Sequence, residues 1–111
     1  METLPLIAPL IGALKEHHPN ANTAEIERAY LVAENAHKGQ LRKSGEEYIT
    51  HPVAVTMILA ELGLNETTLI ASLLHDTVED TPYSLDQLRS DFGDEIANLV
   101  DGVTKLDKLT Y

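Results

Sequence analysis

The sequence has no cysteine, few basic residues and no long apolar run. The lack of cysteine excludes disulfides, thiol catalysis and cysteine–zinc sites. Lys and Arg total 8 against 18 Asp and Glu, which gives a formal net charge of −10. This excess of negative charge argues against DNA binding, because it would repel the phosphate backbone. A small anionic ligand is still allowed, because a local basic patch or a metal ion can override the global charge.

The apolar residues are too dispersed to indicate export or membrane insertion. No stretch approaches the roughly 20 apolar residues that a membrane helix needs. Residues 1–14 include Glu2, Pro5 and Pro9, and they lack the basic start and continuous apolar core of a signal peptide. We therefore expect a cytoplasmic protein without a membrane partner. The length of 111 residues allows one domain.

Apolar residues recur at helical spacing along most of the chain, which predicts an all-α fold of about six helices. The first expected helix covers residues 6–14, and the second starts at 23 and ends at Gly39. The third runs from 51 to 63, and the fourth runs from 65 to 80, ahead of Pro82. A short fifth helix starts at 84, and a sixth runs from 94 through 103. No strand pattern is visible.

Capping residues and apolar positions refine this prediction. Side chains that favour helix N-caps stand at four expected starts, namely Thr23, Asn65, Ser84 and Asp94. The sequence Ser84-Leu85-Asp86-Gln87 also fits a capping box. In the expected third helix, the apolar residues expected to face the core are Val55, Ile58, Leu59 and Leu62.

Residues 39–50 interrupt the helical pattern and form the most basic part of the chain. Three of the 8 Lys and Arg residues lie between Lys38 and Lys43. A loop that carries Arg42, Lys43 and Ser44 would suit a phosphorylated substrate, because guanidinium and ammonium groups neutralise phosphate. The alternative is an ordinary solvated run of charges.

His75 and Asp76 follow directly after the apolar helical run of residues 69–74. Imidazole and carboxylate groups together suit Mn, Fe, Zn or Mg, and harder ions are favoured as oxygen ligands increase in number. The alternative interpretation is a helix end with a favourable histidine and a solvated aspartate.

Three further positions could support such a site. Glu79 and Asp80 lie about one turn beyond the pair, where a carboxylate could orient or deprotonate water. The alternative is a solvated acidic helix end. His51 stands just before Pro52 at an expected helix start, where a histidine is commonly an ordinary surface residue. His37, near the end of the second helix, is expected only to complement the helix dipole.

Together these residues resemble a known family. His51 followed by His75-Asp76 resembles the HD superfamily of metal-dependent phosphohydrolases. Three longer strings resemble the N-terminal hydrolase region of RelA/SpoT-type enzymes, which make and degrade the alarmone (p)ppGpp: HKGQLRKSGEEYITHP (37–52), LLHDTVEDT (73–81) and FGDEIANLVDGVTKL (92–106). The opening residues look like the actinobacterial Rel type. The resemblance covers about residues 26–111 and implies an HD-domain helical bundle.

The resemblance implies a metal centre with adjacent acidic groups. His51, His75 and Asp76 would be ligands of a Mn²⁺ ion. Glu79 and Asp80 would position and activate the attacking water. The family completes its metal site with an aspartate on a helix farther along the chain.

The same resemblance implies the substrate and the reaction. Arg42, Lys43 and Ser44 would lie beside the guanosine tetra- or pentaphosphate, whose 3′-pyrophosphate would be removed to give GDP or GTP. The fourth ligand and the synthetase and regulatory domains would fall beyond Tyr111. Residues 1–111 are thus expected to be the N-terminal part of the hydrolase domain, an incomplete bundle whose exposed apolar surface could drive homo-oligomer formation.

Two other functions stay open at this point. The chain could be a catalytically incomplete module that binds a nucleotide or a protein partner without turnover. It could also be another HD-family phosphohydrolase that acts on a different nucleotide. The strings around Arg42 and Val103 count against this last possibility.

Overall fold

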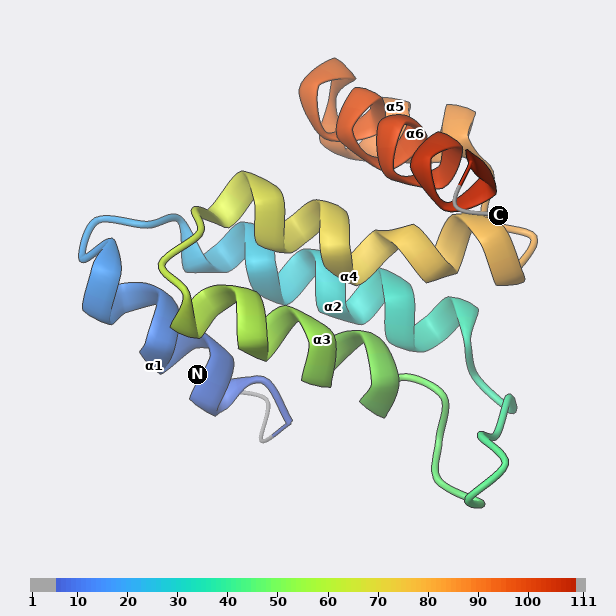
Figure 1. Ribbon diagram of the computed structural model, residues 1–111, viewed down its shortest axis with the longest axis horizontal. Helices are drawn as coiled ribbons and strands as arrows, with labels where there is room; N and C mark the ends of the chain where they lie inside the picture. Colours follow the sequence, from blue (N-terminus) through green and yellow to red (C-terminus); the bar gives the residue numbers. More distant parts are fainter. Residues whose placement is uncertain (1–5, 110–111) are drawn as a thin grey trace.

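Six helices form the fold in the computed structural model, which describes residues 6–109, with side chains described as far as residue 103 (Figure 1). In chain order the helices are α1 (Ala8–His17), α2 (Thr23–Ala36), α3 (Thr50–Glu61), α4 (Glu66–Asp80), α5 (Leu85–Phe92) and α6 (Asp94–Leu109). The expected all-α fold of about six helices is confirmed. Within the described residues, no helix has both the length and the apolarity that a membrane span requires.

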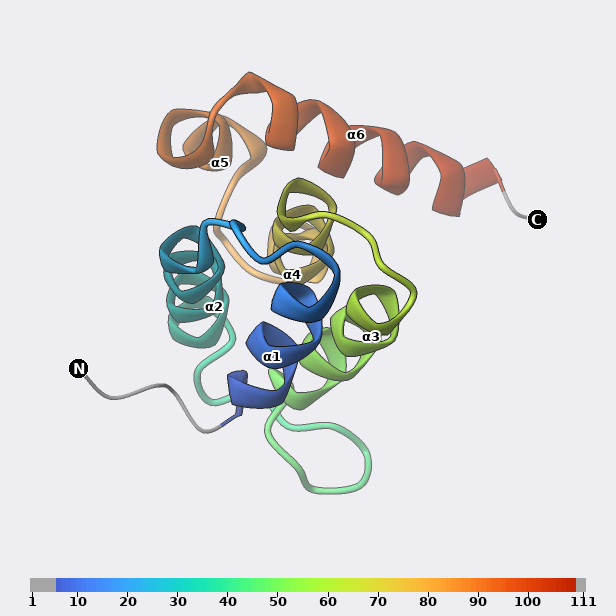
Figure 2. The ribbon, with the colours of Figure 1, turned by 90° about the vertical axis from the view of Figure 1, so that its left-hand side faces the viewer.

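Helix α4 is central to the arrangement. It packs against α2, α3 and α6, and α1 packs against α3. Figure 2 shows α5 and α6 lying together across one side of the bundle that α1 to α4 form. α2 and α4 run in the same direction, whereas α3 runs in the opposite direction (Figure 1). The start of α3 therefore lies at the same end of the bundle as the end of α4.

The apolar face of α4 explains its central position. Leu69, Ile70, Leu73 and Leu74 recur at spacings of three and four residues and are buried. Burying side chains of this size stabilises the fold by about 1.5–3 kcal/mol each. This packing fixes the direction in which the last turns of α4 project their polar side chains.

The sequence correctly identifies two of the four N-caps. The Asn65 side chain accepts a hydrogen bond from the Thr68 N–H at 3.1 Å, and Ser84 forms the expected capping box with Gln87. Thr23 and Asp94 are instead the first residues of their helices. The error is one residue in each case, because Asn22 takes the N-cap position of α2 without a side-chain cap, and Gly93 ends α5 directly before Asp94.

The prediction for α3 is wrong about which face is buried. Val55 and Ile58 are exposed, Leu62 is 72% exposed, and Leu59 is only partly buried. The helix is apolar on most of its circumference, so the apolar spacing does not select one face. The buried residues of α3 are Pro52, Val53, Thr56 and Ala60. The buried Thr56 hydroxyl is satisfied because it donates a hydrogen bond to the Ser72 hydroxyl at 2.7 Å.

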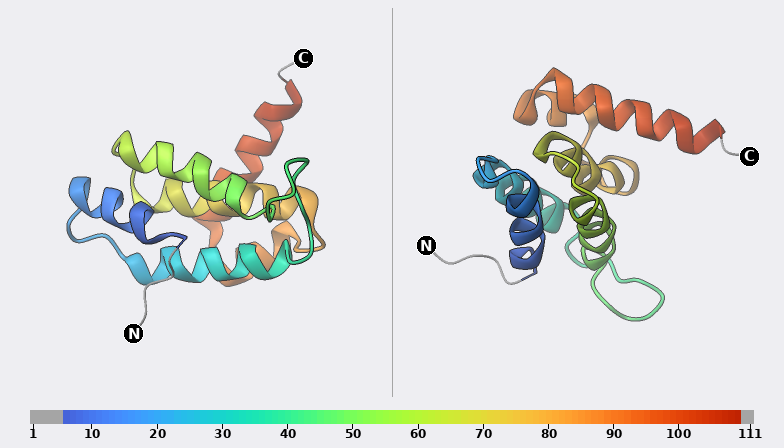
Figure 3. Two further views of the ribbon diagram at one scale, coloured as in Figure 1. Left: turned by 90° about the horizontal axis from the view of Figure 1, so that it is seen from below. Right: turned by 60° about the vertical axis from the view of Figure 1, so that its left-hand side comes forward.

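The segment between α2 and α3 is a compact hairpin turn rather than an irregular loop. Leu41 and Glu47 form an isolated antiparallel bridge, and the Arg42 N–H donates to the Glu46 carbonyl at 2.8 Å. Gly45 has a φ of +93°, a conformation that glycine adopts without steric cost. Figure 3 shows this segment projecting from the end of the bundle where α2 ends and α3 begins.

Candidate metal centre

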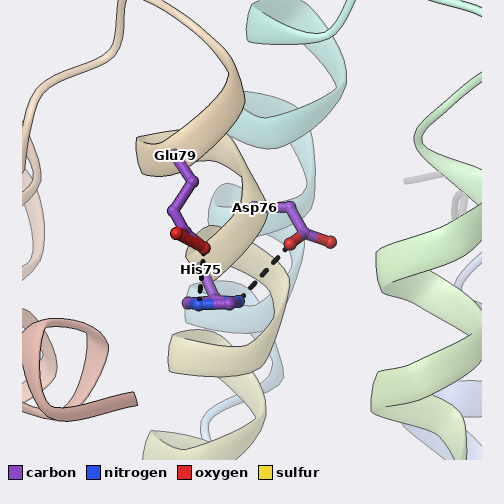
Figure 4. Close-up of side chains that lie close together, drawn as sticks. All are labelled: His75, Asp76 and Glu79. Carbon is purple, nitrogen blue, oxygen red and sulfur yellow. Dashed lines mark ion pairs between the residues drawn. The ribbon is translucent and has the colours of Figure 1, made fainter. Parts of the chain in front are cut away.

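His75 and Asp76 lie on the last turns of α4, immediately after the buried Leu73 and Leu74. Both side chains are partly buried, and Glu79 follows one turn later (Figure 4). Because the preceding leucines anchor the helix in the core, the backbone that carries these polar groups is held in place. The local sequence therefore delivers an imidazole and two carboxylates to one edge of a rigid helix.

The three side chains are close enough to share an ion. His75 Nδ1 lies 3.4 Å from Asp76 Oδ1, and His75 Nε2 lies 3.1 Å from Glu79 Oε2 (Figure 4). One ligand atom from each residue lies within 4.8 Å of the others. Donors at about 2.0–2.2 Å from one ion stand at roughly this spacing. The donor set of imidazole and carboxylates fits a divalent transition metal.

His51 brings a second helix to the same place. It stands in the first turn of α3, and its Nε2 atom lies 3.6 Å from Asp76 Oδ2. His51 and Asp76 are 25 positions apart in the sequence. They approach each other because α3 packs on α4 in the opposite direction. Asp76 thus lies beside both His75 and His51, the three residues that the resemblance assigns to the metal. The set of ligand atoms within 4.8 Å of one another consists of His75, Asp76 and Glu79, and His51 lies next to it through Asp76.

The charge state of Asp76 suits a cation. The hydrogen bond from the His75 ring is the main cause that lowers the pKa of the Asp76 carboxyl. Burial acts in the opposite direction, and the nearby His75 and His51 rings add further lowering. Asp76 is therefore a carboxylate at neutral pH.

Asp80 is not part of this cluster and contacts the hairpin between α2 and α3 instead. Its Oδ2 atom accepts a hydrogen bond from the Tyr48 hydroxyl at 3.1 Å, and its main-chain carbonyl accepts one from Gln40 Nε2 at 3.0 Å. Neighbouring residues on a helix differ by about 100° around its axis, which separates Asp80 from Glu79. The two acids that the sequence treats as a pair therefore face different surroundings.

The basic hairpin lies beside His51. Arg42, Lys43 and Ser44 line a hollow of about 460 Å³ together with Tyr48 and His51. The Arg42 guanidinium lies 3.8 Å from the Glu46 carboxylate, which also accepts a hydrogen bond from the Ser44 hydroxyl at 3.1 Å. The three residues expected to bind a nucleotide thus share one hollow with a candidate metal ligand.

His51 also lines a second hollow. It has a volume of about 420 Å³ and reaches from His51, His75 and Asp76 to apolar side chains of α3 and α6. Those apolar residues include Val55 and Leu59 of α3 and Leu99 and Val103 of α6. The candidate metal ligand His51 therefore lines both a hollow that carries Arg42 and Lys43 and a hollow with apolar side chains from two helices.

His37 lies at the end of the second helix, as expected, where it is the C-cap residue of α2. The structure adds that it is only 2% exposed and is held by two side-chain contacts. Its Nδ1 atom pairs with Gln40 Oε1 at 3.0 Å, and its Nε2 atom pairs with the Thr77 hydroxyl at 3.2 Å. Its spacing from the buried Tyr30 and Ala33 continues the apolar face of α2, and this signal could have predicted its burial. No periodic signal identifies Tyr48 or Gln40.

Known proteins match the chain over most of its length. Residues 29–111 match the HD domain family. The chain is 57% identical over 105 residues to the probable GTP pyrophosphokinase of Mycobacterium leprae, which covers 95% of this chain and 13% of that protein. It is 55% identical over 107 residues to the bifunctional (p)ppGpp synthase/hydrolase RelA of Mycobacterium tuberculosis, covering 96% and 14%. It is 51% identical over 106 residues to the bifunctional (p)ppGpp synthase/hydrolase SpoT of Escherichia coli, covering 96% and 15%.

These matches fix the family and leave the activity open. The chain spans only about one seventh of the length of these relatives, so their names describe proteins with much that this sequence does not include. The matched residues contain His51, His75 and Asp76, which the structure brings together. The chain therefore belongs to the HD domain family and is a relative of the RelA/SpoT (p)ppGpp synthases and hydrolases.

Proposed function

We propose that the chain is the N-terminal part of a Mn²⁺-dependent hydrolase domain that removes the 3′-pyrophosphate from (p)ppGpp. The observation that carries this proposal is the convergence of His51 from α3 with His75 and Asp76 from α4, beside the basic hairpin. The relatives named (p)ppGpp synthase/hydrolase support the choice of substrate. Water attacks the phosphorus next to the ribose 3′-oxygen, the bond to that oxygen breaks, and GDP or GTP leaves with pyrophosphate.

His51, His75 and Asp76 would hold the metal ion, and the donor chemistry of these residues fits it. When bound, the ion would polarise a phosphoryl oxygen and lower the pKa of water. The lowered pKa of Asp76 keeps its carboxylate charged for this purpose. Lys43 and Arg42 would neutralise the phosphates of the nucleotide, and Ser44 would add a hydrogen-bonding hydroxyl.

The two acids at the end of α4 would handle the water. Glu79 lies beside the His75 ring and would take a proton from the attacking water. Asp80 lies near the basic hairpin, where its carboxylate would orient the water relative to the bound nucleotide. The proton would finally reach the ribose 3′-oxygen as the leaving group departs.

The test measures pyrophosphate released from ppGpp by the purified chain, with and without MnCl₂. We expect release that Mn²⁺ stimulates and that His75→Ala or Asp76→Ala reduces to background. His17→Ala is a matched control, because His17 is exposed at the end of α1 and lines neither hollow of the candidate site. Release that survives both site substitutions would contradict the proposal.

Other outcomes of the same assay separate the competing functions. Calorimetric binding of ppGpp without any product would support a catalytically incomplete nucleotide-binding or interaction module. Faster cleavage of dNTPs or cyclic nucleotides than of ppGpp would support another HD-family phosphohydrolase. A cytoplasmic location and self-association through exposed apolar surface are further parts of the proposal, and analytical ultracentrifugation of the chain tests the second.

A further inference from the structure

The hairpin between α2 and α3 holds Asp80 at two points. The Tyr48 hydroxyl donates to the Asp80 carboxylate at 3.1 Å, and the Gln40 side-chain amide donates to the Asp80 main-chain carbonyl at 3.0 Å. Tyr48 and Gln40 flank the turn that carries Arg42 and Ser44, and the Tyr48 N–H donates to the Gln40 carbonyl at 3.0 Å. The segment with the candidate nucleotide-binding residues therefore also contacts an acid at the end of α4.

A buried histidine anchors this contact. The His37 ring bonds to Gln40 through Nδ1 and to Thr77 of α4 through Nε2, at 3.0 and 3.2 Å. Thr77 is completely buried, and His37 is 2% exposed. Buried polar groups that are fully paired in this way make a local structure rigid and specific. Through His37, the start of the hairpin is thus attached to Thr77, which lies three residues before Asp80 on α4.

The Tyr48 ring completes the arrangement. Its centroid lies 4.8 Å from that of His37 and 5.9 Å from that of His51, so it fills the space between the anchor and a candidate metal ligand. The ring contacts hold the Tyr48 hydroxyl where it donates to the Asp80 carboxylate at 3.1 Å.

We propose that Tyr48 is a positioning residue, whose hydroxyl fixes the orientation of the Asp80 carboxylate relative to the candidate metal centre. Asp80 is exposed at a helix end, where without Tyr48 its carboxylate would sample several rotamers. Because Tyr48 belongs to the hairpin that carries Arg42, Lys43 and Ser44, nucleotide binding and the orientation of Asp80 act through one rigid segment. The inference rests on the proposed function, in which Asp80 orients the attacking water.

The decisive variant is Tyr48→Phe, which keeps the ring contacts with His37 and His51 and removes only the hydroxyl. We expect kcat for ppGpp hydrolysis to fall about tenfold, since small misplacements of catalytic groups lower rates by this much or more. KM should change by less than about twofold, because Arg42, Lys43 and Ser44, the residues expected to bind the nucleotide, are intact and the Tyr48 hydroxyl is already paired with Asp80. The affinity for Mn²⁺ should also be unchanged, because His51, His75 and Asp76 are intact.

Tyr83→Phe is the matched control. The Tyr83 hydroxyl also donates to an aspartate, Asp91 Oδ2, at 2.7 Å, and this pair lies outside both hollows of the candidate site. We expect Tyr83→Phe to leave kcat and KM as they are in the parent chain. If Tyr48 acted only on stability, both variants would lower the melting temperature and neither would separate kcat from KM.

A double variant tests the route of the effect. Tyr48→Phe combined with Asp80→Asn should be no slower than Asp80→Asn alone, because Tyr48 acts through the Asp80 carboxylate. This inference would be overturned if the kcat of the double variant fell by the product of the two single-variant losses. It would also be overturned if Tyr48→Phe kept the full kcat of the parent chain. Either result would leave the proposed function intact. Absence of hydrolysis by the parent chain would contradict the proposed function and overturn this inference with it.

Discussion

The carboxylate of Glu79 could act on water or bind the metal. Its Oε2 atom lies 3.1 Å from His75 Nε2, and one of its oxygens lies within 4.8 Å of a ligand atom of Asp76. The two roles differ in whether the affinity for the metal depends on the Glu79 carboxylate. A general base is needed for turnover but not for metal affinity, whereas a ligand is needed for both. Glu79 lies one turn after His75 on the same face of α4, so distance alone does not separate these roles.

We predict that Glu79→Gln lowers hydrolysis by about 10²–10⁴-fold, the usual contribution of a general base. The affinity for Mn²⁺ should stay within about threefold of the parent value, a change of less than 1 kcal/mol. Isothermal titration with MnCl₂ and the pyrophosphate assay measure the two quantities on one preparation. Glu61→Gln, at the exposed end of α3, is the control. A parallel loss of affinity would make Glu79 a ligand instead.

Tyr48 also gives a prediction about pH. Burial raises its pKa from 10.0 to about 12, so the folded state binds the hydroxyl proton more tightly than the unfolded state. The stability from this difference is fully present below about pH 10 and is lost as the pH rises toward 12. The Tyr48→Phe variant lacks this contribution. Between about pH 9 and about pH 11 its free energy of unfolding should therefore fall less than that of the parent chain. Urea unfolding measures both proteins, and equal losses would show that the hydroxyl is not shielded.

At the level of single residues, the sequence predicts the candidate site through motifs rather than through spacing. His51 and His75 are far apart in the chain, and only the known pattern of the family joins them before the structure is seen. The burial of His37 was predictable from the apolar face of α2. The contact of Tyr48 with Asp80 was not, because the hairpin that makes it has no periodic pattern.

Helices with one strongly apolar face are predictable, and helices that are apolar all round are not. In α4 the polar residues Thr68, Ser72 and Asp76 interrupt the apolar ones, so the buried face follows from spacing. In α3 apolar side chains surround the axis, and tertiary packing selects Val53 and Ala60 for the core. The caps at Asn65 and Ser84 were predictable because their partners lie three residues away.

This difference between α3 and α4 predicts opposite outcomes for two leucines. Leu73→Ala should lower the free energy of unfolding by about 2–5 kcal/mol, because Leu73 has no exposed surface and its loss leaves a cavity. Leu62→Ala should change stability by no more than about 0.5 kcal/mol, because Leu62 is 72% exposed. Chemical denaturation of the two variants measures both values. A larger loss for Leu62 would mean that this end of α3 is covered in solution.

On the scale of the whole molecule, the charge is divided between two sides of the candidate site. The net charge of −10 would repel a polyphosphate, yet the hairpin places Arg42 and Lys43 in one hollow beside His51. Asp76 and Glu79 lie on α4, where a bound cation would offset their negative charge. A metal ion next to a basic hairpin thus reconciles an acidic protein with a polyanionic substrate.

The most direct test of the candidate metal centre is the number of Mn²⁺ ions bound per chain, measured by equilibrium dialysis followed by metal analysis. We expect one ion on the parent chain and on His17→Ala, and none on His75→Ala under the same conditions. The prediction follows from the convergence of His51, His75 and Asp76 at the adjoining ends of α3 and α4. No bound ion on the parent chain, or equal binding by His75→Ala, would contradict it.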